Sequence, residues 1–254
     1  MLGTVTLVGA GPGSPDLITL RGLNALKSAD AILHDALVDP ALLEHAKPGS
    51  TILGVGKRGY CIGSTRQETI HGALVRLARE GRNVCRLKCG DPGLFGRGGE
   101  EAEVLASEGI PVEIVPGVSS AFAAAAAGGF ALTHREAGQA IVFATGHHDP
   151  DSDGCTLDWP ALARMPAIAF YMATRHIQRI AAKLIEEGQS PECPFAIVER
   201  ASWPDERITA GTLATLPQQL DELRELAPAV FLVGANVRMP GAVVAGMDVA
   251  ESVR

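Results

Sequence analysis

The chain has 254 residues, of which 46% are hydrophobic and 20% charged, and its formal net charge is −7. This composition is typical of a folded globular protein and excludes a disordered chain. Proteins that coat nucleic acid usually carry the opposite charge balance, so we expect no nucleic-acid partner. The longest weakly polar run, residues 118–132, is too short to cross a bilayer, and we expect no membrane association.

The cysteines are odd in number and scattered, without a CxxC pair, which argues against a disulfide framework and a zinc site. We therefore expect a reducing, cytoplasmic environment. A metal interpretation of the acidic run 149–154 fails because position 12 of a calcium loop would be Pro160 instead of a glutamate. We expect a solvated loop there and no metal. The cysteines are Cys61, Cys85, Cys89, Cys155 and Cys193.

The first half of the chain alternates β-rich runs with amphipathic helices, which predicts a mostly parallel sheet with helices on its faces. Thr19 is expected to cap the first helix, and Thr65 with Glu68 to form a capping box before the second. Gly81 is expected to end that second helix. The expected strands cover residues 4–8, 29–33, 51–55, 83–88 and 112–115, and a further helix covers 100–107.

The pattern changes at Pro116-Gly117, where we place a domain boundary between an N-terminal domain, residues 1–117, and a C-terminal domain, residues 118–254. An alanine-rich helix follows this boundary, and another helix is expected over 174–187. The remaining β-rich runs lie close enough together for hairpins, which predicts a mixed sheet. These runs cover residues 141–144, 168–171, 195–199, 207–210 and 230–233.

Glycines follow the first expected strand in the run Gly9-Ala-Gly-Pro-Gly13. Three interpretations stay open: a loop that lets a ligand approach the backbone, a tight structural turn, or a dinucleotide site with Asp35 on the ribose. The spacing is G-x-G-x-G, and Pro12 has no N–H to donate to a phosphate. Both features speak against the dinucleotide site.

The stretch 87–101 carries the strongest functional signal, because it follows the fourth expected strand, where open α/β sheets bind ligands. Its glycines allow the backbone to wrap a ligand. Asp91 can accept hydrogen bonds from a ribose or an amine, and Arg97 offers a planar fork for a carboxylate. Cationic loops at 56–59 and 132–135 could join Arg97 around a polyanionic small molecule, although each alone is typical of solvated surface.

Eight motifs, in this order, resemble the tetrapyrrole methylase family and, within it, the uroporphyrinogen-III C-methyltransferases. The resemblance extends over nearly the whole chain, from about residue 4 to about residue 245. The motifs are Val8–Gly13, His34–Val38, Gly56–Arg58, Gly90–Glu101, Pro116–Ser120, Leu132–Arg135, Thr145–His147 and Tyr171-Met172.

The resemblance implies a two-domain α/β fold with a mostly parallel N-terminal sheet, a mixed C-terminal sheet and the active site in the cleft between them. It implies S-adenosyl-methionine as methyl donor, no metal, a homodimer, and methylation of uroporphyrinogen III at C2 and C7 to precorrin-2, in sirohaem or cobalamin biosynthesis. Asp35 and Lys57 match the positions of a proton acceptor and donor. The implied cofactor contacts are Pro12, Cys89, Gly90, Asp91, Leu94, Ser119, Ser120, Met172, Ala201 and Ala229, and the implied substrate contacts are Arg97, Glu100, His134 and Arg135.

The sequence departs from the family pattern at three positions: Cys89 replaces a usual glycine, Ala131 a proline and His34 a tyrosine. None of these changes removes a proposed functional group. Three other functions stay open: a nicotinamide- or flavin-dependent oxidoreductase, a non-catalytic tetrapyrrole-binding protein, and a methylase that acts later in corrin synthesis. The motifs at 95–101 and 132–135 argue against the third. The residues that argue against the second are the retained Asp35, Lys57, Asp91 and Arg97.

Overall fold

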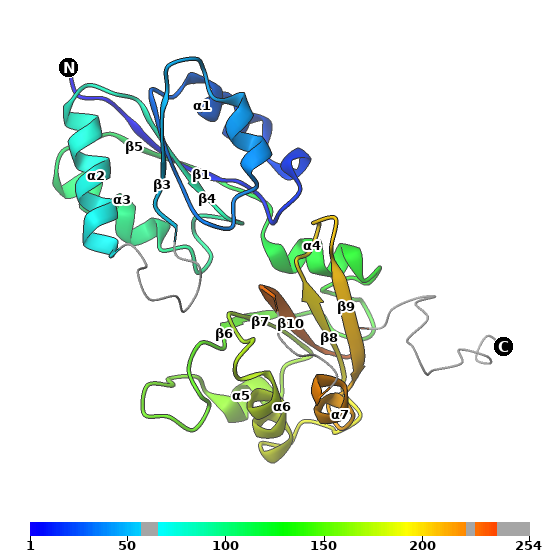
Figure 1. Cartoon of the computed structure of the whole chain (residues 1–254). Helices are drawn as coiled ribbons and strands as arrows, with labels where there is room; N and C mark the ends of the chain where they lie inside the picture. The colour runs from blue at the N-terminus through cyan, green and yellow to red at the C-terminus, as the bar shows by residue number, and fades with distance from the viewer. Residues whose placement is uncertain (57–65, 222–226, 238–254) are drawn as a thin grey trace. The chain divides into compact units, whose positions relative to one another are not determined.

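The structure is a computed structural model that describes residues 1–56, 66–221 and 227–237 (Figure 1). The chain divides into two compact units, Met1–Ser120 and Ala121–Arg254. Each unit holds one five-stranded sheet of its own. The domain boundary that the sequence places near residue 117 stays a prediction.

The first unit is an α/β unit whose sheet has the strand order β3-β2-β4-β1-β5. All of its strand pairs are parallel, as the alternation of strands and helices predicts. Its strands are β1 Val5–Gly9, β2 Ala31–His34, β3 Thr51–Gly54, β4 Val84–Lys88 and β5 Val112–Val115. Its α-helices are α1 Leu20–Ser28, α2 Gln67–Arg79 and α3 Gly98–Ser107, and short 3-10 turns cover Pro15–Leu17 and Pro40–His45.

Helix starts in this unit follow local chemistry, with one correction. The Thr19 hydroxyl accepts a hydrogen bond from the Gly22 N–H at 3.1 Å, so the expected cap of α1 is confirmed. Helix α2, however, begins after Arg66, which makes no side-chain capping bond, so the expected capping box was wrong. Thr65 itself lies outside the described residues. Gly81, with a φ of +81°, follows the end of α2 as expected.

Strand β4 is buried along its whole length and separates two apolar clusters. Cys85 and Leu87 pack into the cluster beneath α1. Val84 belongs to the opposite cluster, which α2 and α3 cover. Because side chains alternate along a strand, Arg86 and Lys88 lie on this second side, inside the protein. Two buried cations on one strand require buried partners of opposite charge.

The second unit has a mixed sheet with the order β6-β7-β10-β8-β9, which confirms the predicted architecture. Its first pair, β6 with β7, is parallel, and the other pairs are antiparallel. The strands are β6 Val142–Thr145, β7 Ala167–Tyr171, β8 Pro194–Glu199, β9 Arg207–Thr212 and β10 Ala229–Gly234. The helices are α4 Ser120–Ala127, α5 Trp159–Ala163, α6 Ile177–Glu186 and α7 Leu216–Asp221.

Helices cover both faces of this second sheet. The alanines of α4 pack on one face, against small and branched residues such as Ala169 and Val230, and their short side chains let the helix come close. Helices α5, α6 and α7 lie on the other face, around Phe170 and Phe231 (Figure 1). The short α5 and α7 carry too few turns for a periodic signal and were not expected. Among the described residues, no helix combines the length and apolarity needed to span a bilayer.

Candidate functional site

The site residues expected in the first unit lie together at the carboxyl ends of its parallel strands. Strands β1, β2, β4 and β5 run parallel, so the segments that follow them leave from the same side. Pro12 follows β1 and Asp35 follows β2. The run from Cys89 to Leu94 follows β4, and Ser119 with Ser120 follows β5. Residues far apart in the sequence thus converge because the strands are parallel.

Backbone hydrogen bonds join the loops after β1 and β4. The Gly90 N–H donates to the Gly11 carbonyl at 2.7 Å, and the Gly11 N–H donates back to the Gly90 carbonyl at 3.3 Å. Both glycines have positive φ values, +83° at Gly11 and +70° at Gly90, which side-chain-bearing residues adopt only with strain. A Cβ on Gly90 would meet no atom within 4 Å, so this backbone borders open space.

The loop after β5 is fastened to the same place. A Cβ on Gly117 would lie 2.3 Å from the Gly90 carbonyl oxygen and 2.7 Å from the Gly9 Cα, so no larger residue fits. The Asp91 carboxylate accepts from the Gly93 N–H through Oδ1 at 2.7 Å and from the Gly117 N–H through Oδ2 at 2.9 Å. Asp91 therefore uses both carboxylate oxygens to connect the loops after β4 and β5. The sequence predicted that Asp91 accepts hydrogen bonds from a ribose or an amine of a ligand, which stays a prediction, and it gave no sign of this internal role.

Cys89, which departs from the family pattern, is half-buried at the end of β4. Burial raises the pKa of its thiol to about 12, and the nearby negative charge of Asp35 acts in the same direction. The thiol is therefore neutral at physiological pH and is a poor nucleophile. Its presence leaves the Gly90 bridge to Gly11 intact.

Asp35 is half-buried and held in a defined position. Its backbone N–H donates to the Leu87 carbonyl at 3.0 Å, and its Oδ1 lies 2.5 Å from a terminal nitrogen of Arg86. A Cβ on Gly56 would overlap the backbone of Asp35 and Ala36, so residue 56 packs directly against this turn. Lys57, the expected proton donor, lies outside the described residues.

A buried charged network extends inward from Asp35. Glu101 Oε1 accepts from Arg86 Nε at 3.3 Å, from Lys88 Nζ at 2.9 Å and from Gln67 Nε2 at 3.1 Å. Glu101, Arg86 and Lys88 are each at most 2% exposed. Desolvation and the positive charge of Arg86 lower the pKa of Lys88 from its ordinary value, against the opposing effect of Asp35 and Glu101. No sequence motif pointed to this network, although two cations alternating in the strand VCRLK were a signal of it.

Arg97 and Glu100, both expected to contact the tetrapyrrole, bind each other. Arg97 Nε donates to one oxygen of Glu100 at 2.9 Å and a terminal nitrogen donates to the other at 2.6 Å. The pairing raises the pKa of Arg97 and lowers that of Glu100. Arg97 has a φ of +59° at the N-cap of α3. The fork that the sequence assigned to a substrate carboxylate thus holds a carboxylate of the chain itself.

The expected cofactor contacts of the second unit also lie together, at the same end of three neighbouring strands. Met172 follows β7, Ala201 lies just after β8, and Ala229 begins β10, which is antiparallel to both. Met172 is 46% exposed with a φ of +55°. Ala201 is buried between Arg200 and Ser202, whose φ values of +49° and +68° are also left-handed. Strained backbone of this kind clusters at functional sites.

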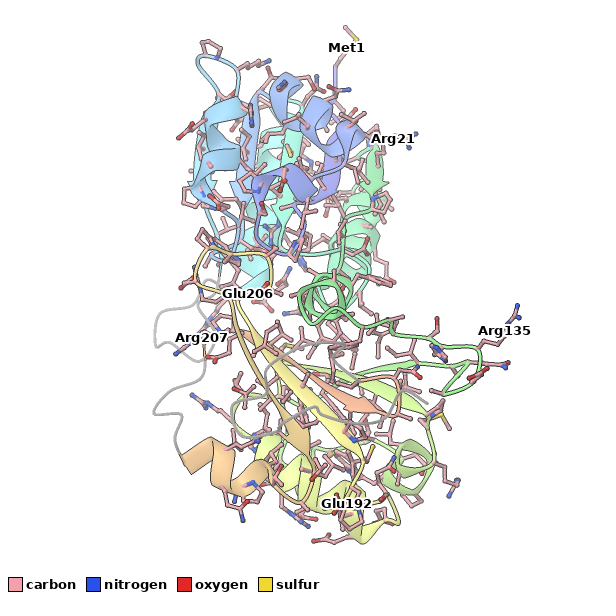
Figure 2. All side chains as sticks on the ribbon, turned by 90° about the vertical axis from the view of Figure 1, so that its right-hand side faces the viewer. Met1, Arg21, Arg135, Glu192, Glu206 and Arg207 are labelled. Carbon is pink, nitrogen blue, oxygen red and sulfur yellow. The ribbon has the colours of Figure 1, made fainter. Side chains whose placement is uncertain are left out.

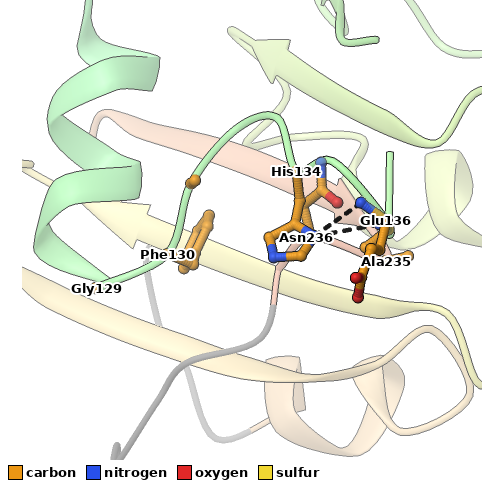
Figure 3. Close-up of a pocket in the computed structure, with 8 residues that line it drawn as sticks. Gly129, Phe130, His134, Glu136, Ala235 and Asn236 are labelled. Atoms are coloured by element: carbon orange, nitrogen blue, oxygen red, sulfur yellow. Dashed lines mark hydrogen bonds between the residues drawn. The ribbon is translucent and has the colours of Figure 1, made fainter. Parts of the chain in front are cut away.

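His134 lies in a turn of the second unit that borders a cavity of about 510 Å³ (Figure 3). Its Nδ1 accepts from the Glu136 N–H at 3.2 Å and the Ala137 N–H at 3.3 Å, which places the proton of a neutral ring on Nε2. Asn236 donates to the Leu132 carbonyl at 3.0 Å and steadies the turn. Arg135 extends from this turn into solvent (Figure 2).

The acidic run after β6 binds within the chain. The Asp149 carboxylate accepts from the Asp151 N–H at 3.0 Å, and Asp151 pairs with Arg179. In the part of the chain that the structure describes, no three His, Cys, Asp or Glu side chains gather as a metal site would require.

Comparisons with known proteins place this geometry in context. A family model, Tetrapyrrole (Corrin/Porphyrin) Methylases, matches residues 4–217. The uroporphyrinogen-III C-methyltransferase of Priestia megaterium is 44% identical over 237 residues, which are 93% of this chain and 99% of that protein. The siroheme synthase of Thioalkalivibrio sulfidiphilus (strain HL-EbGR7) is 42% identical over 239 residues, 93% of this chain, but the chain spans only 48% of that protein.

A solved structure agrees with these matches. The uroporphyrin-III C-methyl transferase from Thermus thermophilus, complexed with S-adenyl homocysteine, superposes with a TM-score of 0.79 at 39% identity, over 93% of this chain and 99% of that one. The likeness therefore covers nearly all of both chains. The chain belongs to the family of tetrapyrrole (corrin/porphyrin) methylases.

Proposed function

We propose that the chain transfers methyl groups from S-adenosyl-methionine to C2 and then C7 of uroporphyrinogen III, giving precorrin-2. The observation that carries this proposal is the carboxyl edge of the first sheet, where three loops are fastened together around open space beside Gly90. The relative from Thermus thermophilus, solved with the demethylated form of this methyl donor, supports the same ligand here.

The residues at this edge fit the methyl donor. The glycine backbone at Gly90 can approach a ligand closely, and the buried Pro12 and half-buried Leu94 add apolar surface. In the second unit, Met172 and Ala201 offer apolar contacts. When bound, the sulfonium of this donor supplies an activated methyl group. The chain's contribution is then to hold the reacting carbon in line with that group.

Proton transfer is the second requirement, because the macrocycle must lose a proton after a methyl group has been added to one of its pyrrole carbons. We assign the acceptor role to Asp35, whose carboxylate is fixed by Arg86 at the sheet edge. Lys57 is the proposed donor. A side chain positioned within hydrogen-bond reach of the proton it transfers contributes about 10²–10⁴-fold to the rate.

The substrate carries eight carboxylates, whereas the chain has a net charge of −7, so local cations must attract it. Arg135 is exposed and Arg97 stands at the start of α3. Arg97 already holds Glu100, so a substrate carboxylate has to share or displace this partner. We propose that Arg97, Glu100, His134 and Arg135 together contact the tetrapyrrole rim.

The wider setting is proposed on the same basis. Relatives named siroheme synthase support a role in sirohaem biosynthesis, and the family's name also includes the corrins, the ring class of cobalamin. We propose a homodimer that works in the cytoplasm. Four cysteines of the described residues, Cys85, Cys89, Cys155 and Cys193, are free thiols, in keeping with a reducing compartment.

The test is an anaerobic incubation with uroporphyrinogen III and S-adenosyl-methionine, followed by mass spectrometry of the tetrapyrrole. Two added methyl groups are expected, with one-methyl material early in the time course. An unchanged tetrapyrrole, with the folded protein still able to bind S-adenosyl-homocysteine, would indicate a binding protein and refute the proposal. A thermal shift with NAD in place of the methyl donor would favour an oxidoreductase instead.

A further inference from the structure

We propose that Glu101 is a positioning residue for methyl transfer, which anchors Arg86 from inside the protein so that Arg86 holds Asp35 in place. The inference rests on the proposed function, in which Asp35 accepts the proton. It adds a residue that does not contact the substrate and that no motif of the sequence singled out for this role.

Arg86 is held from several sides. One terminal nitrogen lies 2.5 Å from Asp35 Oδ1, while Nε faces Glu101 Oε1 at 3.3 Å. The other terminal nitrogen donates to the carbonyls of Leu33 and Leu87 at 3.4 and 3.3 Å. The guanidinium therefore has an acceptor on each side and cannot rotate without losing one of them. The buried Glu101 binds the inner side of the guanidinium, and the half-buried Asp35 binds its outer side.

Glu101 is itself anchored. It lies in the first turns of α3, where its N–H donates to the Arg97 carbonyl at 3.2 Å. The Gly98 N–H donates to the Pro92 carbonyl at 3.0 Å, and a Cβ on Gly98 would come within 2.5 Å of that oxygen. The start of α3 is thus fixed to the loop that carries Asp91. Glu101 thereby connects the proposed proton acceptor with the proposed cofactor loop.

The charges of this network balance. Arg86 and Lys88 carry two positive charges, and Asp35 and Glu101 carry two negative ones, so the set is neutral while Asp35 is ionised. Buried charges need such compensation, because an unpaired buried charge is strongly destabilising. Other titratable groups around the network within the described residues are Glu68 and His71 of α2, Arg97 and Glu100 at the start of α3, His34 of β2, Cys85 of β4 and Cys89 just after it.

Glu101→Gln separates charge from shape. The amide oxygen of glutamine can still accept from Arg86 and Lys88, but the negative charge is gone. Every neighbouring group then loses a proton more easily, including Lys88, whose pKa Glu101 raises against the lowering effects of burial and Arg86. We expect the whole pH–rate profile to move to lower pH. At neutral pH we expect a fall in kcat of roughly 10- to 100-fold, because a small misplacement of a reacting group has this effect.

The matched control is Glu103→Gln, which removes one exposed carboxylate from the same helix. We would measure kcat against pH with both substrates saturating, and the Kd for S-adenosyl-homocysteine by calorimetry. For Glu101→Gln we expect the shifted profile with a Kd within about twofold of wild type. Glu103→Gln is expected to match wild type in both. A folded Glu101→Gln with the wild-type profile and kcat would overturn the inference, as would a fall in kcat that only parallels lost cofactor affinity.

A second variant keeps the test valid if Glu101→Gln does not fold. Lys88→Met with Glu101→Gln restores neutrality, leaving Arg86 and Asp35 as one ion pair, and keeps the amide oxygen near Arg86. We expect its pH profile to return toward wild type. If the pH profile of the double variant still lies at lower pH than that of wild type, the inference is contradicted. Asp35→Asn is measured beside it. If Asp35→Asn is inactive while Glu101→Gln is fully active, this inference alone is refuted. If the wild-type chain is inactive, the proposed function is refuted.

Discussion

Asp91 offers the sharpest test of how the cofactor loops are held. Its carboxylate accepts from two backbone N–H groups, at Gly93 and Gly117, which belong to two different loops. A hydrogen bond to a charged group contributes about 1.5–3 kcal/mol. Asp91→Asn keeps one acceptor oxygen and loses one bond, while Asp91→Ala loses both. If binding must restore the order of the loops, and each bond contributes the lower value, the Kd for S-adenosyl-homocysteine rises roughly tenfold for the asparagine variant and roughly 150-fold for the alanine variant.

Calorimetric titration with S-adenosyl-homocysteine measures these affinities, and hydrogen exchange of the Gly93 and Gly117 amides in the ligand-free protein tests the cause. Both amides should exchange faster in Asp91→Ala. The matched control is Asp39→Ala, which removes a carboxylate that accepts from the Ala41 N–H at 2.8 Å in the same unit. This control should lose stability but not affinity. A folded Asp91→Ala with wild-type affinity refutes the reasoning, and lost affinity with unchanged amide exchange shows that Asp91 contacts the ligand directly.

Three further changes test the loop packing and the substrate site. Gly117→Ala should lower both the melting temperature and the cofactor affinity, because its Cβ would overlap the Gly90 carbonyl, whereas Gly72→Ala, in open space on α2, should stabilise by about 0.4–1 kcal/mol in thermal melts. Arg97→Ala should leave S-adenosyl-homocysteine binding near normal and cripple turnover of the tetrapyrrole, with lysine rescuing only partly; turnover at the wild-type rate would move the substrate site elsewhere. Arg135→Ala should behave likewise, and added salt should raise KM for the tetrapyrrole more than Kd for the cofactor, as steady-state rates at several ionic strengths would show.

Much of the fold could be predicted because local patterns and tertiary structure agree. The alternation of strands and helices up to residue 115 indicated the parallel sheet, and the cap at Thr19 was predicted correctly from its position before an amphipathic run. The capping box at Thr65 failed because α2 begins one residue later than its spacing required. The short helix α5 was missed because its five residues show no helical period.

The site was harder to predict, because pairing depends on three-dimensional contacts. Glycine positions indicated the loops. No local pattern in the sequence indicated that both carboxylate oxygens of Asp91 would accept hydrogen bonds from backbone N–H groups. The pair Arg97 and Glu100 follows helical spacing and could have been anticipated. Glu101 could not, since its partners Arg86 and Lys88 come from a strand that only the folded sheet places beneath α3.

The measurement that tests the proposed methyl transfer most directly uses S-adenosyl-methionine labelled with ¹³C at the methyl group. The purified chain is incubated with uroporphyrinogen III under anaerobic conditions, and the product is examined by ¹³C NMR. We predict two labelled methyl groups, one bonded to C2 and one to C7 of the macrocycle, with the methyl group at C2 appearing first. Transfer to other carbons, or no transfer by a folded protein that binds S-adenosyl-homocysteine, would contradict the proposal.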